Sequence, residues 1–260
     1  MMYPAAARRT FLSSPCHLQM CIRDRCEGIA RSFAREGAKV VLVDKKPVVL
    51  EKAKEICEDG GEALGLNLDI SVEANWKIIL EEALRKFQTC NVLVNGAAEF
   101  SLTGDWNSGH PGFLENWDIV YKANVMGLVY SVQTFVPYFI EQGGGTVMNF
   151  TSSTGITYVG SGCQAYPASK AAIKIITQDM AAQHAKDHVR FNCVAPNFCY
   201  TPENDEIYTK FHDWFLKDTP LGFLGSVEDV ANCALYLCSD ESKYITGVCI
   251  PIDGGYTACH

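Results

Sequence analysis

The chain has 260 residues, of which 48% are hydrophobic and 20% charged, and its formal net charge is −8 at pH 7. This profile is typical of one soluble α/β domain, and no apolar run reaches the roughly 18 residues that a membrane helix needs. The acidic balance, without a lysine or arginine stripe, argues against nucleic acid as a partner. The 12 cysteines are dispersed without a C-x-x-C pair, which predicts no metal site and favours a reducing cytoplasm.

Strand and helix patterns alternate along the chain. The run over residues 38–44 is continuously apolar and ends in Asp44, as expected of a parallel strand buried on both faces. Similar strands are predicted over residues 62–69, 90–98, 145–153, 189–196 and 247–255. Amphipathic helices are predicted between them, at residues 27–36, 46–61, 72–88, 116–142, 165–185 and 226–240. Repeated β-α units predict an α/β fold with a doubly wound parallel sheet and helices on both faces.

Tyr166 and Lys170, within the sequence YPASK, are four residues apart and therefore share one face of a predicted helix. A lysine ammonium held beside a phenol favours the ionised phenolate, which provides a general acid or base near neutral pH. A surface tyrosine with a solvated lysine is the ordinary alternative for this pair alone.

Three other polar stretches accompany this pair. NFTSSTG, residues 149–155, ends a predicted strand with hydroxyls that bond either a carbonyl oxygen or the backbone as a cap. Asn124 lies within a predicted helix, where asparagine needs a reason such as a buried hydrogen bond. VNGAA, residues 94–98, offers small side chains that let a flat group approach a strand end.

Together these stretches resemble the short-chain dehydrogenase/reductase family over about residues 27–256. YPASK, NFTSSTG, KANVMG, RFNCVAP and GFLGSVEDVANCALYLCSD occur in the family's order and spacing, and the ordered set is far more specific than any one motif. The resemblance implies one Rossmann-type domain over residues 26–260. It also implies an NAD(P)-dependent oxidoreductase that interconverts a secondary alcohol and a ketone, and a homo-oligomer, commonly a tetramer.

The resemblance further implies catalytic roles. Tyr166 would donate or accept the proton at the substrate oxygen, and Lys170 would hold the nicotinamide ribose and tune the tyrosine. Ser152 would hold the substrate oxygen, with Ser153 as the runner-up. Asn124 would anchor a water in a proton relay to Lys170.

The cofactor contacts implied by the family lie at the strand ends. Asp44 would bond the adenosine ribose, and Asp69 and Ile70 would border the adenine. Asn95 would border the middle of the cofactor, and the Cys199 backbone with Thr201 would contact the carboxamide. Because Asp44 meets a 2′-phosphate as a like charge, NAD is expected rather than NADP. The adjacent Lys45 and Lys46 oppose that preference.

The chain departs from the family at several positions. The family's NNAG reads Asn95-Gly-Ala-Ala, its proline-glycine pair reads Pro196-Asn197, and its PLGR arginine is Phe223. The glycine-rich loop TGxxxGIG would fall at residues 19–26, which read QMCIRDRC and contain no glycine. Glycine is needed there so that the backbone approaches the pyrophosphate, and Asp24, Arg25 and Cys26 are expected to obstruct it.

The first strand of the fold is predicted to be missing or replaced. The segment with Pro15 before the loop is a poor strand, so its two neighbours in the sheet are expected to lack backbone partners. Residues 19–24 are also the translation of cag-atg-tgt-ata-aga-gac, which resembles the transposon end used to build sequencing libraries. Residues 1–25 are therefore predicted to be a non-native segment, with a genuine divergent N-terminus as the alternative.

The predicted function is that of a cytoplasmic oxidoreductase with a small-molecule alcohol or ketone as substrate. A catalytically silent binding or scaffold protein is one alternative, favoured by the altered loop. A dehydratase or epimerase is another, found mainly in longer relatives. Residues 200–225 are expected to set the substrate, and their aromatic side chains predict either an apolar lid or plain helix packing. Steroid or bile-acid alcohols, sugars and acyl thioesters all remain open.

Overall fold

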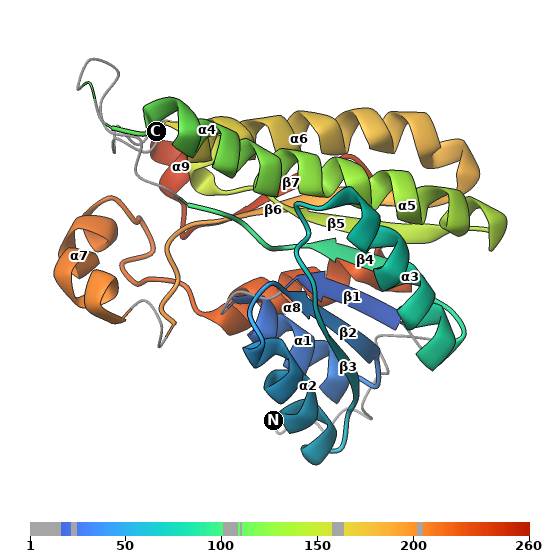
Figure 1. Cartoon of the computed structure of the whole chain (residues 1–260). Coiled ribbons are helices and arrows are strands. Elements are labelled where there is room, and N and C mark those ends of the chain that lie inside the picture. The colour runs from blue at the N-terminus through green and yellow to red at the C-terminus, as the bar shows by residue number, and fades with distance from the viewer. Residues whose placement is uncertain (1–16, 22–24, 101–108, 110, 158–163, 202–204) are drawn as a thin grey trace, which may run out of the picture.

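The computed structural model describes residues 17–21, 25–100, 109, 111–157, 164–201 and 205–260. Within them, parallel strands form one sheet in the order β3-β2-β1-β4-β5-β6-β7. The strands are β1 (His17–Cys21), β2 (Lys39–Asp44), β3 (Glu62–Asn67), β4 (Val92–Asn95), β5 (Gly145–Phe150), β6 (Val189–Pro196) and β7 (Cys249–Ile252). The predicted doubly wound parallel sheet is confirmed (Figure 1).

Helices cover both faces of this sheet (Figure 1). The described helices are α1 (Arg25–Arg35), α2 (Val48–Glu58), α3 (Glu73–Phe87), α4 (Phe113–Tyr121), α5 (Gly127–Glu141), α6 (Ala165–His184), α7 (Asp205–Lys217), α8 (Val227–Cys238) and α9 (Tyr256–Cys259). A π-helical turn, Lys122–Met126, joins α4 to α5, so the long helix predicted there is one run with a local widening. Among the described helices, none has both the length and the apolar character of a membrane span.

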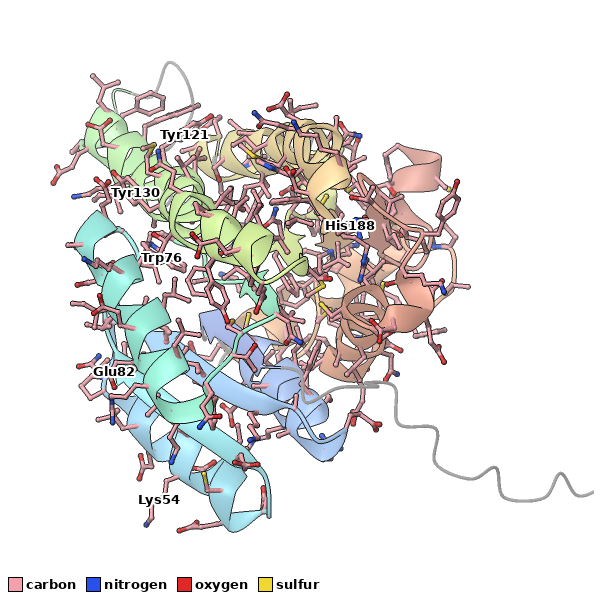
Figure 2. All side chains as sticks on the ribbon, turned by 90° about the vertical axis from the view of Figure 1, so that its right-hand side faces the viewer. Lys54, Trp76, Glu82, Tyr121, Tyr130 and His188 are labelled. Atoms are coloured by element: carbon pink, nitrogen blue, oxygen red, sulfur yellow. The ribbon has the colours of Figure 1, made fainter. Side chains whose placement is uncertain are left out.

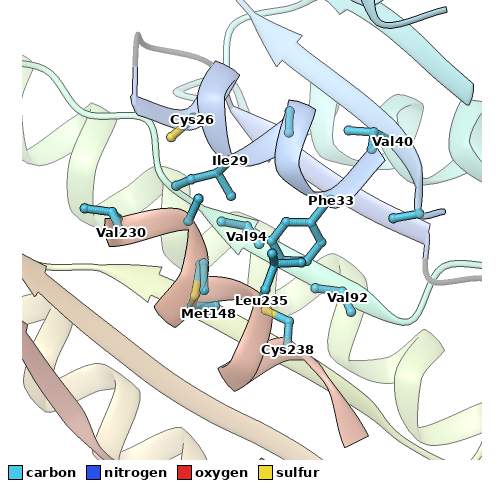
Figure 3. Packing of buried hydrophobic residues seen from close by; sticks show 14 of the residues in the cluster. Cys26, Ile29, Phe33, Val40, Val92, Val94, Met148, Val230, Leu235 and Cys238 are labelled. Atoms are coloured by element: carbon cyan, nitrogen blue, oxygen red, sulfur yellow. The ribbon is translucent and has the colours of Figure 1, made fainter. Parts of the chain in front are cut away.

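Two apolar clusters hold the layers together. One packs α1, α2 and α8 against one face of the sheet, and Figure 3 shows Ile29 and Phe33 of α1 facing Val230 and Leu235 of α8. The two helices approach closely because residue 28 is glycine: a Cβ there would overlap the side chain of Val227. The other cluster packs α3, α5 and α6 against the opposite face.

Aromatic side chains fasten the second cluster. Trp76 of α3 is fully buried, meets Phe135 of α5 edge-on at 6.3 Å between ring centres, and donates its indole N–H to the Ile70 carbonyl oxygen at 2.9 Å. Figure 2 shows Trp76 on α3 next to α5, where Tyr130 lies. These contacts anchor the chain just after β3, on the edge of the sheet that carries the predicted cofactor residues.

The central strand β1 is formed by residues of the unusual N-terminal segment. Its backbone pairs with β2, from His17 opposite Lys39 to Cys21 opposite Val43, and with β4 on the other side. The expectation that β2 and β4 would lack partners is therefore wrong. The prediction rested on side-chain pattern, but two open strand edges supply hydrogen-bond partners to any extended backbone between them.

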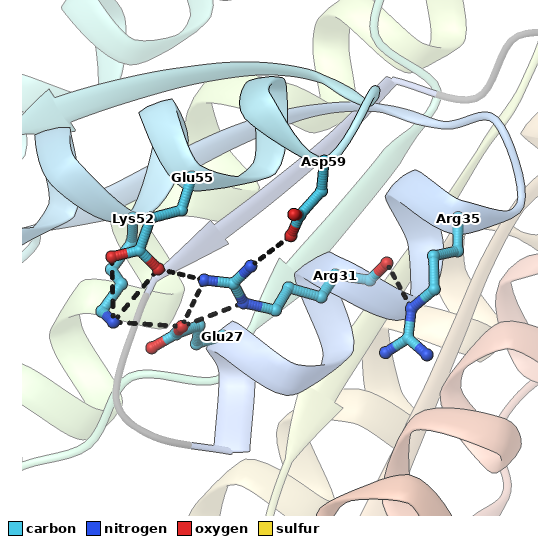
Figure 4. A network of polar contacts seen from close by, with 6 residues as sticks. All are labelled: Glu27, Arg31, Arg35, Lys52, Glu55 and Asp59. Atoms are coloured by element: carbon cyan, nitrogen blue, oxygen red, sulfur yellow. Dashed lines mark hydrogen bonds and ion pairs between the residues drawn. The ribbon is translucent and has the colours of Figure 1, made fainter.

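An ion-pair network ties α1 to α2 on the outside of the sheet (Figure 4). Arg31 contacts Glu27 at 2.9 Å, Asp59 at 3.0 Å and also Glu55. Lys52 lies 3.4 Å from Glu27 and 3.3 Å from Glu55. Because these groups are partly exposed, solvent screens each pair and the network contributes little to the stability of the fold.

Candidate active site

Polar side chains collect at the carboxyl edge of the sheet, where parallel α/β folds bind ligands. A small cavity of about 70 Å³ lies there, between the ends of β2, β3 and β4. Its walls are formed by Val43, Asp44, Lys45, Lys46, Asp69, Ile70, Ala97, Ala98, Glu99 and Ala123. The structure therefore brings together three residues that the sequence assigns to the adenosine end of a cofactor: Asp44, Asp69 and Ile70.

Tyr166 and Lys170 lie one turn apart at the start of α6. The Lys170 Nζ is 5.5 Å from the centre of the Tyr166 ring, although the lysine is only 2% exposed. The ammonium donates a hydrogen bond of 2.8 Å to the carbonyl oxygen of Phe150, at the end of β5. A buried lysine needs such compensation, and here it is held beside the phenol that the sequence predicts as its partner.

The turn after β5 packs directly on this part of α6. Thr151 donates its hydroxyl to the Lys170 carbonyl oxygen at 2.6 Å. A Cβ at Gly155 would lie 2.8 Å from the Lys170 carbonyl carbon, so only glycine lets the turn approach this closely. Ser152 and Ser153 lie in the chain between these two contacts, which hold them next to the backbone of Lys170.

The two serines have different surroundings. The Ser153 hydroxyl is buried and donates to the Asn197 side-chain oxygen at 3.0 Å. The Ser152 hydroxyl is bonded only locally in these contacts, accepting from the Thr154 backbone N–H at 3.3 Å and pairing with the Thr154 hydroxyl at 3.1 Å. Ser152 is 9% exposed and Ser153 1%, and the choice of Ser152 as the residue that holds the substrate oxygen stays a prediction.

Asn124 lies within the π-helical turn and is buried. Its side-chain oxygen accepts from the Glu99 backbone N–H at 2.6 Å. Its amide donates to the Glu99 carbonyl oxygen and to the Ser169 hydroxyl, both at 3.0 Å. The side chain thus joins the segment after β4 to α6, and the helix widening is of the kind often found at functional sites.

A buried hydrogen-bond chain crosses the middle of the site. Asn95 at the end of β4 donates to Asn149 of β5 at 2.9 Å, and Asn149 donates to the Thr177 hydroxyl on α6 at 2.9 Å. Thr177 in turn donates to the Ile173 carbonyl oxygen at 2.7 Å. The chain fixes the orientation of Asn95 at the strand end.

The turns that follow β2 and β3 are closed by their own carboxylates. Asp44 accepts from the Lys46 backbone N–H at 2.7 Å, and Asp69 accepts from the Ser71 backbone N–H at 2.8 Å. Such turns hold an aspartate at a defined angle to the strand end. Cys199 and Thr201, the other predicted cofactor residues, are buried on the segment after β6. The backbone of Cys199 forms an isolated parallel β-bridge with that of Gly225.

The aromatic residues between β6 and α8 pack mainly on one another. Phe198 stacks on Phe215 of α7 with ring centres 4.0 Å apart, and Tyr200 meets Tyr208 edge-on at 4.9 Å. Trp214 remains about half exposed. In Figure 1, α7 stands away from the sheet at the carboxyl edge. These contacts fit the helix-packing interpretation, and the lid stays a prediction.

Two residues at the site carry no signal in the sequence. Phe100 lies edge-on to Tyr166 with ring centres 5.2 Å apart, and Glu99 forms an ion pair with Lys45 at 3.0 Å. Both follow a strand in a loop, where no periodic pattern indicates burial or direction. Their only indication is their position directly after the VNGAA stretch.

The side chain of Cys26 lies elsewhere than predicted. It was expected to obstruct the pyrophosphate site, but it is buried in the cluster between α1 and the sheet (Figure 3). Its Sγ occupies the space that a Cβ at Gly96 would fill. Cys26 replaces a smaller glycine of the family, and Gly96 replaces a larger asparagine. The two replacements lie in contact. Asp24 lies outside the described residues.

We therefore expect Gly96→Ala to lower the free energy of unfolding by about 1–3 kcal/mol, because the methyl group overlaps the Cys26 Sγ in a packed core. The backbone of Gly96 is outside the left-handed region, so strain of that kind does not contribute. Urea denaturation of both proteins measures the difference. In a Cys26→Ala background the same substitution should cost much less, and an equal loss in both backgrounds would exclude the contact as the cause.

The sequence and the fold are similar to those of known proteins. A family model described as enoyl-(acyl carrier protein) reductase matches residues 26–257. The chain is 35% identical over 229 residues to the 3-oxoacyl-[acyl-carrier-protein] reductase FabG of Thermotoga maritima, covering 86% of this chain and 89% of that protein. It is 32% identical over 234 residues to the 2,5-dichloro-2,5-cyclohexadiene-1,4-diol dehydrogenase LinX of Sphingobium indicum, covering 88% and 90%.

Solved structures agree with these relatives. The 3-ketoacyl-(acyl-carrier-protein) reductase of Brucella melitensis, complexed with NADH, superposes with a TM-score of 0.82 at 29% identity, covering 93% of this chain and 98% of that one. The short-chain type dehydrogenase/reductase of Mycobacterium marinum gives a TM-score of 0.87 at 27% identity, covering 95% and 98%. Fold, motif order and sequence identity together make this chain a member of the short-chain dehydrogenase/reductase family of oxidoreductases.

Proposed function

We propose that the chain is a nicotinamide-dependent oxidoreductase that interconverts a secondary alcohol and a ketone. The observation that carries this proposal is the buried Lys170 ammonium, held 5.5 Å from the centre of the Tyr166 ring. A tyrosine with a fixed cation beside it is a suitable proton donor and acceptor for an alcohol oxygen. The names of the relatives, all dehydrogenases or reductases, support the same class of reaction.

The residues at the adenosine end fit a nicotinamide dinucleotide. The cavity between β2 and β4 combines the Asp44 carboxylate, which suits ribose hydroxyls, with the small side chains of Ala97 and Ala98, which suit a flat ring. Asp69 and Ile70 would border the adenine and Asn95 the middle of the cofactor. Cys199 and Thr201 would contact the carboxamide. Such a cofactor, when bound, supplies or accepts the hydride.

The remaining chemistry belongs to the chain's own side chains. Tyr166 would transfer the proton at the substrate oxygen, donating it in reduction and accepting it in oxidation. The Ser152 hydroxyl would hold that oxygen, and the Lys170 ammonium would stabilise the phenolate left after donation. Asn124 would anchor a water in the proton relay to Lys170, from a side chain that also bonds Ser169 and the segment after β4.

The test uses the purified chain and a loop-restored variant, in which residues 19–26 carry the family's T-G-x-x-x-G-I-G pattern. Both are mixed with NAD or NADH and a panel of secondary alcohols and ketones, and the cofactor absorbance is followed. We expect turnover of at least one alcohol–ketone pair in the loop-restored variant. Cofactor binding without turnover of any substrate would favour the binding or scaffold protein instead.

Cofactor preference gives a separate prediction. We expect the catalytic efficiency with NAD to exceed that with NADP by about tenfold, because the Asp44 carboxylate repels a 2′-phosphate. Asp44→Ala should reduce this ratio, mainly by lowering the efficiency with NAD. Steady-state kinetics with both cofactors measure the ratio, and equal efficiencies in the unsubstituted protein would contradict the role of Asp44.

A further inference from the structure

An ion pair lies at the cavity beside Asp44, where the adenosine end of the cofactor would bind. The Lys45 Nζ lies 3.0 Å from the Glu99 carboxylate, so the residue after β2 is joined to the segment after β4. Both residues line the cavity that also contains Asp44. The lysine side chain is 55% exposed, whereas the glutamate side chain is only 19% exposed. The pair therefore joins an exposed ammonium to a largely buried carboxylate.

Glu99 is fixed through its backbone. Its N–H donates to the Asn124 side-chain oxygen at 2.6 Å, and its carbonyl oxygen accepts from the Asn124 amide at 3.0 Å. Asn124 is itself buried and bonded to Ser169 on α6. The carboxylate of Glu99 is thus held at a set place on the rim, and the longer, flexible Lys45 side chain reaches it.

We propose that Glu99 is a positioning residue that sets cofactor selectivity by engaging Lys45, and this inference rests on the proposed nicotinamide function. Lys45 directly follows Asp44 and lines the same cavity, so its ammonium would attract a phosphate attached to the ribose 2′ oxygen. The ion pair engages that ammonium with Glu99 and lowers the positive potential available to the phosphate. Two carboxylates would then disfavour NADP: Asp44 by direct repulsion of the 2′-phosphate, and Glu99 by neutralising Lys45.

The effect should be moderate because Lys45 is exposed. Ion pairs at such sites are worth up to about 1 kcal/mol, which corresponds to about fivefold in an equilibrium constant. Release of Lys45 in Glu99→Gln should raise the affinity for a 2′-phosphate by about this factor and leave the affinity for an unphosphorylated ribose nearly unchanged. The neutral glutamine keeps the size and the backbone of the glutamate.

Adenosine 2′-phosphate and adenosine are suitable probes, since neither contains the pyrophosphate that the glycine loop would bind. Both are titrated by NMR into the full chain and into Glu99→Gln, Lys45→Met and the double variant. The measured quantity is the ratio of the two association constants. We expect this ratio to rise about fivefold in Glu99→Gln and to change less than twofold when the same substitution is made in the Lys45→Met background.

A matched ion pair provides the control. Glu62 lies 3.8 Å from Lys39 at the opposite, amino end of β2 and β3. Glu62→Gln changes the net charge equally and should leave the ratio unaltered.

Each other outcome is decisive. An equal rise with and without Lys45 would show that Glu99 repels the phosphate directly, and an unchanged ratio in Glu99→Gln would exclude any role in selectivity; either result overturns this inference alone. Failure of every variant, correctly folded by circular dichroism, to bind both probes would overturn the adenosine site itself and with it the proposed function.

Discussion

Replacement of Tyr166 by phenylalanine is expected to lower turnover by a factor on the order of 10² or more while cofactor affinity stays nearly constant. Only the hydroxyl is removed, and with it the group that would transfer the proton to the substrate oxygen. The ring itself remains and keeps its edge contact with Phe100. Steady-state turnover of the loop-restored variant, with cofactor affinity from calorimetry, measures both quantities. A decrease of less than threefold would remove Tyr166 from the mechanism.

Lys170→Ala provides the contrast to this substitution. It removes the buried ammonium that lies beside the Tyr166 ring and is bonded to the Phe150 carbonyl oxygen. Because Lys170 would serve both the tyrosine and the nicotinamide ribose, we expect both turnover and cofactor affinity to fall. If Lys170→Ala lowered turnover alone, its proposed contact with the ribose would be excluded.

The chain with its present residues 19–26 is expected to bind NAD at least about 100-fold more weakly than the loop-restored variant. Glycine-rich backbone donates hydrogen bonds to the pyrophosphate, and bonds to charged groups are worth about 1.5–3 kcal/mol each. The loss of two such bonds corresponds to about 10²-fold or more in affinity. Calorimetric titration of NAD into both proteins measures the difference.

Adenosine serves as the internal control for that comparison. It lacks the pyrophosphate and would bind beside Asp44 under the proposed function, so its affinity should be similar in both proteins if the loop alone differs. Micromolar NAD binding by the unaltered chain would show that residues 19–26 replace the glycine loop functionally. That result would also contradict the prediction that residues 1–25 are a non-native segment.

The apolar runs and the spacing within motifs predict much of this molecule. The run ending at Asp44 is β2, and the four-residue spacing of Tyr166 and Lys170 places them on one face of α6, as helical geometry requires. These features depend on local periodicity, which a sequence displays directly.

The features that the sequence does not predict depend on partners distant in the chain. β1 forms because β2 and β4 offer open edges, although its own residues have no strand pattern. Cys26 turns into the core because Gly96, 70 residues later, leaves room for its sulfur. Glu99 and Phe100 meet Lys45 and Tyr166 across the carboxyl edge, and no pattern within a loop specifies such contacts.

The hydrogen-bond chain from Asn95 through Asn149 to Thr177 favours one register of β4 against β5 during folding. Asn95 lies directly opposite Asn149 in the pairing of β4 with β5. A shift of one residue would turn the side chain of one asparagine to the other face of the sheet. It would then lie opposite an apolar residue such as Val94 or Met148, whose size does not exclude it. The displaced amides would be buried without partners, at about 1–3 kcal/mol each. Apolar contacts thus make the two strands adhere, while one pair of amides selects the single alignment in which the strand ends are level.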